Sequence, residues 1–105
     1  MPLAFDLTEE ATADLEEIVG YIAVENQRAA LRIADELESA FQFLADWPFA
    51  GHLRQDLIDS DLVRFWLSSR YLIVYSPFKT PLLIVAVFHG SRDIAEHLPR
   101  RLETF

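Results

Sequence analysis

The sequence predicts an α+β domain in which a helical hairpin packs on a small, mostly antiparallel sheet, in the order β-αα-βββ-α. The first half contains two consecutive stretches in which apolar residues recur every three or four positions, the period of an amphipathic helix. The second half contains three β-rich runs separated by short links, as in a meander. The length of 105 residues suits one hydrophobic core. We therefore expect residues 1–105 to form a single domain.

The first two elements are expected to be a short strand and a helix. Residues 3–7 alternate between apolar and small or polar side chains, which favours a strand. Thr8 follows as a candidate N-cap, and Glu9 and Glu10 then place negative charge at the positive end of a helix dipole. The apolar positions of this helix are Ala11, Leu15, Ile18, Val19 and Ile22. The helix is expected to end near Glu25.

A second helix is expected directly after the first, so that the two form an αα-hairpin. Its apolar positions are Ala30, Ile33, Ala34, Leu37, Phe41 and Leu44. It should end at Trp47, because Pro48 disfavours helical geometry in the residue before it. Residues 49–60 are expected to form a loop with room for one turn of helix.

The remaining elements are an antiparallel meander and a short terminal helix. The β-rich runs are residues 62–67, 71–75 and 82–88. A turn containing Pro77 and Pro81 separates the last two runs, which is typical of a hairpin. Asp93 and Glu96 have the spacing of a capping box, which predicts a helix near residues 94–101.

Composition excludes several kinds of chemistry. The chain has no cysteine, so it forms no disulfide, thiolate metal site or cysteine nucleophile. Its three histidines lack the spacing of a metal site, and no glycine-rich phosphate loop is present. We therefore expect no metal and no cofactor. The start of the chain does not read as a signal peptide, and no apolar run approaches the roughly 20 residues of a membrane span. A cytoplasmic protein without membrane association is expected.

The net charge of −8 is distributed unevenly along the chain. Residues 1–50 contain eleven acidic and two basic residues, whereas residues 51–105 contain six acidic and seven basic residues. An acidic surface disfavours contact with nucleic acid, so no sequence-specific nucleic-acid binding is expected. The acidic face of the helices is either simply solvated or a recognition surface for a basic segment of a partner.

Residues 71–93, which read YLIVYSPFKTPLLIVAVFHGSRD, form the most distinctive stretch. They resemble the "YLI-x-Y … V-x-HG-x-RD" ending of the RelE/ParE superfamily, the toxins of bacterial toxin–antitoxin pairs, and most closely its ParE (plasmid-stabilisation) branch. The family motif ends on His89, Gly90, Arg92 and Asp93. A purely structural interpretation of these residues also remains open, in which Gly90 permits a turn, Arg92 pairs with a carboxylate and Asp93 caps a helix.

The resemblance to the ParE branch implies a toxin of a type II toxin–antitoxin module. Toxins of this kind are not enzymes: they poison DNA gyrase by binding it, until a ParD-like antitoxin binds and neutralises them. The expected partners are therefore an antitoxin, in a hetero-oligomer, and DNA gyrase.

The RelE branch implies a different function, a ribosome-dependent mRNA endonuclease. In that case Arg64 and Arg92 would stabilise the scissile phosphate and His89 would act as general acid or base. Tyr71 or Tyr75 would stack on a base. A third alternative is a non-toxic module that only binds an antitoxin.

The aromatic residues of the meander are candidates for antitoxin binding: Phe65, Trp66, Tyr71 and Tyr75. Strand alternation places Phe65 and Trp66 on opposite faces, so one of the two should face solvent or a partner. In the family, the antitoxin wraps around the toxin, and exposed aromatic side chains suit such an interface. The other interpretation is that most of these rings pack beneath the helices.

Overall fold

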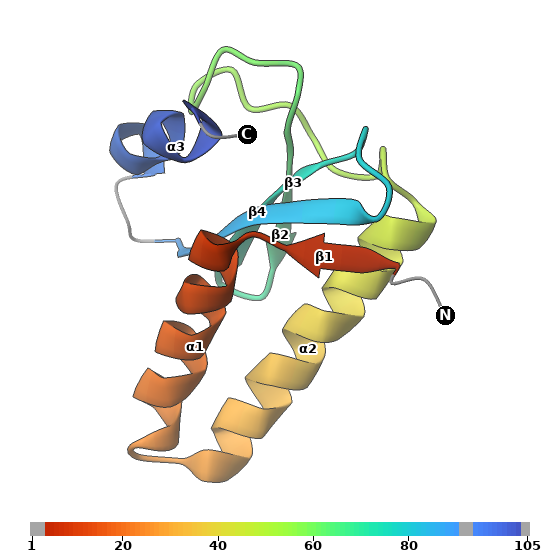
Figure 1. Ribbon diagram of the computed structural model, residues 1–105. Coiled ribbons are helices and arrows are strands. Elements are labelled where there is room, and N and C mark those ends of the chain that lie inside the picture. Colours follow the sequence, from red (N-terminus) through yellow and green to blue (C-terminus); the bar gives the residue numbers. More distant parts are fainter. Residues whose placement is uncertain (1–3, 91–93, 104–105) are drawn as a thin grey trace.

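A four-stranded sheet with the order β1-β4-β3-β2 lies at the centre of the computed structural model, which describes residues 4–90 and 94–103 (Figure 1). The strands are β1 (Phe5–Leu7), β2 (Arg64–Ser68), β3 (Tyr71–Ser76) and β4 (Leu82–His89). The helices are α1 (Glu9–Ala23), α2 (Gln27–Asp46) and α3 (Ile94–Glu103). The α+β class and the order β-αα-βββ-α are confirmed.

Side-chain caps define the helical hairpin. The Thr8 hydroxyl accepts a hydrogen bond from the Ala11 N–H at 3.0 Å, and the Asn26 side chain accepts one from the Ala29 N–H at 2.9 Å. α1 ends at Ala23, slightly earlier than predicted, and the extended Asn26 separates it from α2. The far end of the hairpin projects well beyond the sheet (Figure 1).

The sheet is antiparallel except at one edge. β2 pairs with β3 and β3 with β4 in antiparallel fashion, whereas β1 runs parallel to β4. The pairing of β1 reaches only from Phe5, opposite Leu82, to Leu7, opposite Ile84. Beyond Ile84, therefore, no strand covers the outer edge of β4 within the described chain.

Both faces of the sheet are buried, which explains the almost uninterrupted apolar runs of β3 and β4. On one face, Leu37 and Phe41 of α2 pack on Tyr75 and Ile84. On the other, Leu98 of α3 joins a second cluster with strand residues and the loop before β2. The sheet is thus the middle of three layers.

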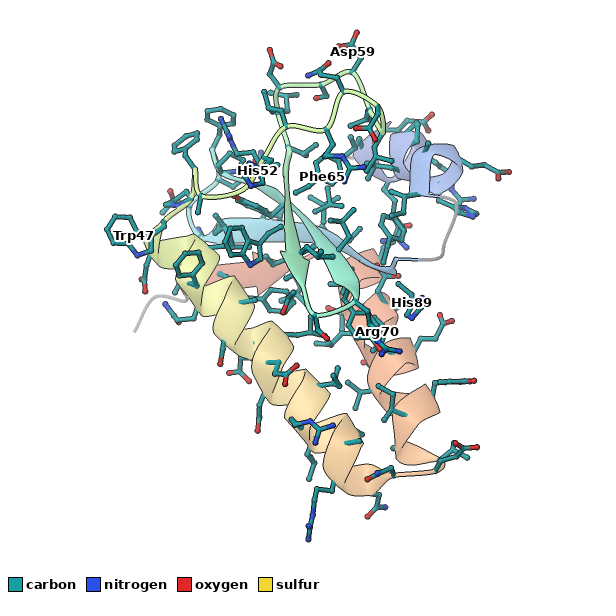
Figure 2. All side chains as sticks on the ribbon, turned by 180° about the vertical axis from the view of Figure 1, so that it is seen from behind. Trp47, His52, Asp59, Phe65, Arg70 and His89 are labelled. Atoms are coloured by element: carbon teal, nitrogen blue, oxygen red, sulfur yellow. The ribbon has the colours of Figure 1, made fainter. Side chains whose placement is uncertain are left out.

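The segment between α2 and β2 forms turns and no helix. The Leu57 and Ile58 N–H groups both donate to the Arg54 carbonyl at 3.0 Å, so the expected helical turn is a single hydrogen-bonded turn that does not continue. The tip of this loop, marked by Asp59, projects away from the helical hairpin (Figure 2). The capping box predicted for α3 depends on Asp93, which lies outside the described residues.

Candidate partner-binding surface

A groove of about 830 Å³ lies between α2 and β2, the strand at the edge of the sheet. We call it the α2–β2 groove; its lining includes Arg32, Asp35, Glu36, Phe43, Trp66 and Ser68. Phe43 and Trp66 make its apolar end, with ring centroids 5.2 Å apart. An open groove with aromatic anchors is typical of a surface that binds another protein.

Two apolar residues of this groove lie outside the periodic set that predicted α2. Leu31 is 67% exposed and Phe43 is 40% exposed, whereas Leu37 and Phe41 are buried. Apolar side chains on the solvent face of an amphipathic helix are the signal that would have predicted this surface from sequence.

The four aromatic residues predicted to bind an antitoxin occupy different environments. Phe65, Tyr71 and Tyr75 are 2%, 6% and 0% exposed, and they belong to the core. Phe65 and Trp66 do lie on opposite faces of the sheet, as strand alternation requires. Of the four, Trp66 alone lines the α2–β2 groove, so it alone offers this surface to a partner.

Tyr75 holds the loop that follows α2. Its hydroxyl donates to the Pro48 carbonyl at 2.7 Å and accepts from the Gly51 N–H at 2.9 Å. Arg64 supports the same loop, because its Nη1 donates to the Gly51 carbonyl at 2.9 Å and its guanidinium lies 5.1 Å from the centre of the Phe49 ring. Both side chains therefore stabilise the conformation of the loop that follows α2.

The residues predicted for ribonuclease chemistry are not brought together by the described chain. Arg64 pairs with Tyr75 across the sheet, and His89 pairs with Tyr71. This register separates Arg64 and His89 by about 13 Å along the strands and about 10 Å across them. A single phosphate cannot contact both side chains. Arg92, the third member, lies outside the described residues.

At the end of the sheet near His89, a ring contact and a backbone hydrogen bond stabilise the fold. The His89 ring packs edge-to-face on Tyr71, with centroids 5.5 Å apart, and the Gly90 N–H donates to the Arg70 carbonyl at 3.0 Å. A Cβ at Gly90 would lie 3.2 Å from that carbonyl oxygen, so the close approach favours glycine. Figure 2 shows Arg70 and His89 together at this end, far from Trp47 and His52.

A second group of exposed rings extends the apolar end of the groove. Trp47, Phe49 and Phe78 are all more than half exposed, and the rings of Phe49 and Phe78 meet edge-to-face at 5.5 Å. Phe43 lines both the α2–β2 groove and the hollow beside Trp47, so the two surfaces are continuous. These rings were not predicted as part of a surface, because Trp47 marked only the expected end of a helix.

A cluster of charged residues attaches α3 to α1. Arg101 Nη1 and Nη2 bond the two carboxylate oxygens of Asp14 at 2.7 and 2.8 Å, and Arg101 Nε contacts Glu10 at 3.0 Å. The Val87 N–H donates to Asp14 Oδ2 at 3.0 Å, and the guanidinium lies 5.2 Å from the Phe88 ring centre. We call this the Asp14–Arg101 clasp. It covers part of the β4 edge beyond β1, because Asp14 accepts a hydrogen bond from the Val87 N–H there.

Burial raises the pKa of the Tyr75 hydroxyl above its ordinary value of 10.0. Above pH 10 the unfolded chain releases this proton while the folded protein keeps it, so the free energy of unfolding should fall as the pH rises. We expect Tyr75→Phe to reduce that alkaline decline. At neutral pH the variant should lose about 1–2 kcal/mol, because the Gly51 N–H then lacks its acceptor. Urea titrations at several pH values measure both effects.

Tyr21→Phe controls for the loss of a hydroxyl, because Tyr21 is 83% exposed on α1. An unchanged alkaline decline in Tyr75→Phe would contradict the assignment of that decline to Tyr75.

Residues 4–90 and 94–103, which the structure describes, lack two further features. They contain no cluster of three or more His, Asp or Glu side chains placed to hold a metal ion. None of their helices is long and apolar enough to cross a lipid bilayer.

Both the fold and the sequence of the chain are similar to those of known proteins. The fold is similar to that of a solved structure described as the chromosomal ParDE TA system from P. aeruginosa, with a TM-score of 0.66 and 18% sequence identity; the match covers 81% of this chain and 92% of that one. The two chains therefore share the same α+β fold. Residues 5–94 match the family model described as the ParE toxin of the type II toxin–antitoxin system, parDE. No curated protein sequence matches the chain. The chain belongs to the ParE toxin family.

Proposed function

We propose that this protein poisons DNA gyrase by binding it, and that a ParD-like antitoxin neutralises it in a hetero-oligomer. The observation that carries the proposal is the match of residues 5–94 to the ParE toxin family, whose expected action is gyrase poisoning. The similar structure from P. aeruginosa comes from a ParDE system, which supports an antitoxin of ParD type. Gyrase acts in the bacterial cytoplasm, so the cytoplasm is the expected location.

The arrangement of polar residues supports binding over catalysis. The Arg64 guanidinium is bonded to the Gly51 carbonyl and covers Phe49, so it has little freedom to follow a reacting phosphate. His89 lies at the opposite end of the sheet and packs on Tyr71. A poison that acts by binding needs an accessible apolar surface instead, and the α2–β2 groove with its neighbouring rings provides one.

Antitoxin-free protein, added to purified gyrase, provides the direct test. We expect loss of supercoiling and accumulation of cleaved DNA, both dependent on the toxin-to-gyrase ratio. A matched reaction with a type I topoisomerase should show neither effect. Unchanged supercoiling and cleavage at a large molar excess would exclude gyrase as the target.

Pulse labelling in bacteria then separates the alternatives. Soon after this chain alone is induced, gyrase poisoning should reduce DNA synthesis while translation continues. An early collapse of translation would instead indicate mRNA cleavage. Normal growth at high expression would indicate a non-toxic antitoxin-binding module.

A further inference from the structure

We propose that a pocket between α1 and the end of β4 binds an aliphatic primary ammonium group, carried by a free diamine or by a lysine side chain. We call it the α1–β4 pocket; its volume is about 380 Å³, and its lining includes Asp14, Glu17, Tyr21, Tyr71, Val87 and His89. His89 marks the strand end of this pocket in Figure 2. No residue lines both this pocket and the α2–β2 groove, so the inference goes beyond the proposed function.

One face of α1 forms the charged wall of the pocket. Asp14, Glu17 and Tyr21 are three and four positions apart, so they lie on the same side of the helix. Arg101 already binds Asp14, so the exposed Glu17 is the carboxylate expected to contact a ligand. α1 contains five acidic residues and no Lys or Arg, and no Lys or Arg of the described chain lines the pocket. Negative charge of this kind attracts a cation and disfavours an anion.

The opposite wall contains a tyrosine hydroxyl that the fold does not use. Tyr71 is only 6% exposed, and its ring packs against His89, yet its hydroxyl forms no hydrogen bond with any described residue. In the described chain, Arg64 Nε is the only fully buried side-chain N or O atom without a partner. The Tyr71 hydroxyl therefore reaches the open space of the pocket that its residue lines. A largely buried tyrosine usually bonds its hydroxyl, so a ligand is the partner expected here.

A backbone carbonyl of β4 adds a second acceptor. The Val87 N–H donates to Asp14 at 3.0 Å, which shows that the backbone groups of Val87 point away from β3. The Val87 carbonyl points to the same outer side, and no described residue donates a hydrogen bond to it. β1 does not extend this far along β4, because its pairing ends at Ile84. The carbonyl is therefore available to a donor in the pocket.

These acceptors select the class of ligand. A primary ammonium has three N–H donors and no acceptor, which matches the Tyr71 hydroxyl, the Val87 carbonyl and the Glu17 carboxylate. Its methylene chain can pack on Ile18 and on Tyr21, which is 83% exposed at the mouth of the pocket. The face of a tyrosine ring also attracts a cation. The volume is near the lower end for small-molecule sites and suits a chain of about four to six carbon atoms.

Two probes, added to the full ¹⁵N-labelled chain and followed by NMR, test the site. Putrescine (1,4-diaminobutane) represents a free diamine, and Nα-acetyl-lysine methylamide represents the side chain of another protein. At least one probe should shift the amide signals of Ile18 and Val87 with a dissociation constant below about 1 mM. The probe that binds more tightly identifies the source of the ammonium group. 1,4-Butanediol, which has the length of putrescine without its charge, should shift neither signal. A dissociation constant above about 1 mM for both amines would overturn the inference.

Two neighbouring glutamates separate this pocket from general attraction to an acidic surface. Glu16 and Glu17 are both exposed, but only Glu17 lines the pocket. Glu17→Gln should weaken binding of the tighter probe about fivefold, whereas Glu16→Gln should change the affinity by less than about twofold. Equal weakening by the two variants would show that the net negative charge alone attracts the amine, and would overturn the inference.

Tyr71→Phe tests the buried hydroxyl. The change removes one oxygen atom to which no described residue is bonded, so the melting temperature without ligand should not fall by more than about 2 °C. Binding of the tighter probe should weaken about tenfold, as expected for the loss of a hydrogen bond to a charged group. Unchanged affinity in this folded variant would show that the ammonium group does not occupy the α1–β4 pocket.

Discussion

Replacing Asp14 by alanine is expected to lower the free energy of unfolding by about 3 kcal/mol, the largest effect that we expect from a single charged residue. The change removes two bonds from Arg101, whose side chain is only 12% exposed, and leaves this cation with a more distant carbonyl and Glu10. It also removes the acceptor of the Val87 N–H on the edge of β4. Breaking a largely buried ion pair from one side leaves the other charge poorly compensated, which explains the size of the effect.

Thermal and urea unfolding measure this loss, which should lower the melting temperature by about 10–20 °C. Glu16→Ala is the matched control, since it removes an exposed carboxylate from the same helix and should change stability by less than about 0.5 kcal/mol. Asp14→Asn keeps an acceptor for Val87 and should fall between the two. Equal stability of Asp14→Ala and Glu16→Ala would show that the clasp contributes nothing.

Replacing Gly51 by alanine should cost about 3 kcal/mol for a steric reason. A Cβ there would lie 2.5 Å from the Tyr75 hydroxyl oxygen, 2.8 Å from Tyr75 Cε1 and 2.9 Å from the Phe65 carbonyl oxygen. The ring is held in the core and the carbonyl belongs to β2, so neither can move easily. Relief of the clash would also break the bonds between Tyr75 and the loop.

Gly20→Ala provides the contrasting glycine. No atom lies within 4 Å of a Cβ at Gly20, which is inside α1, so alanine should stabilise the helix by about 0.5–1 kcal/mol. Urea denaturation of the two variants should thus give changes of opposite sign. A Gly51→Ala protein as stable as the original would mean that the loop after α2 moves away at little cost.

Local signals predicted the secondary structure well. The periodic apolar residues gave both long helices, and Thr8 caps α1 as expected. The prolines around Phe78 marked the hairpin between β3 and β4. Each of these features depends on residues close together in the sequence, where spacing and backbone preference are informative.

Contacts between distant residues were not predictable in this way. Asp14 and Arg101 are 87 positions apart, and nothing local distinguishes either from the other charged residues of its helix. Tyr75 was expected as a candidate binding residue, but its hydroxyl finds partners in a loop about 25 residues earlier, so it is buried without an unsatisfied polar group. Of the four aromatic residues predicted to bind an antitoxin, Trp66 is the one that lines the α2–β2 groove, and its role in binding stays a prediction.

The two edges of the sheet differ in a way that limits how many molecules can associate. β1 is only three residues long, and the rest of that edge is occupied by side chains of α1 and α3. β2 is five residues long, and His52 already pairs with Phe65 on its outer side, so the stretch left for another strand is short. Short or partly covered edge strands disfavour the open-ended edge-to-edge pairing that leads to fibres.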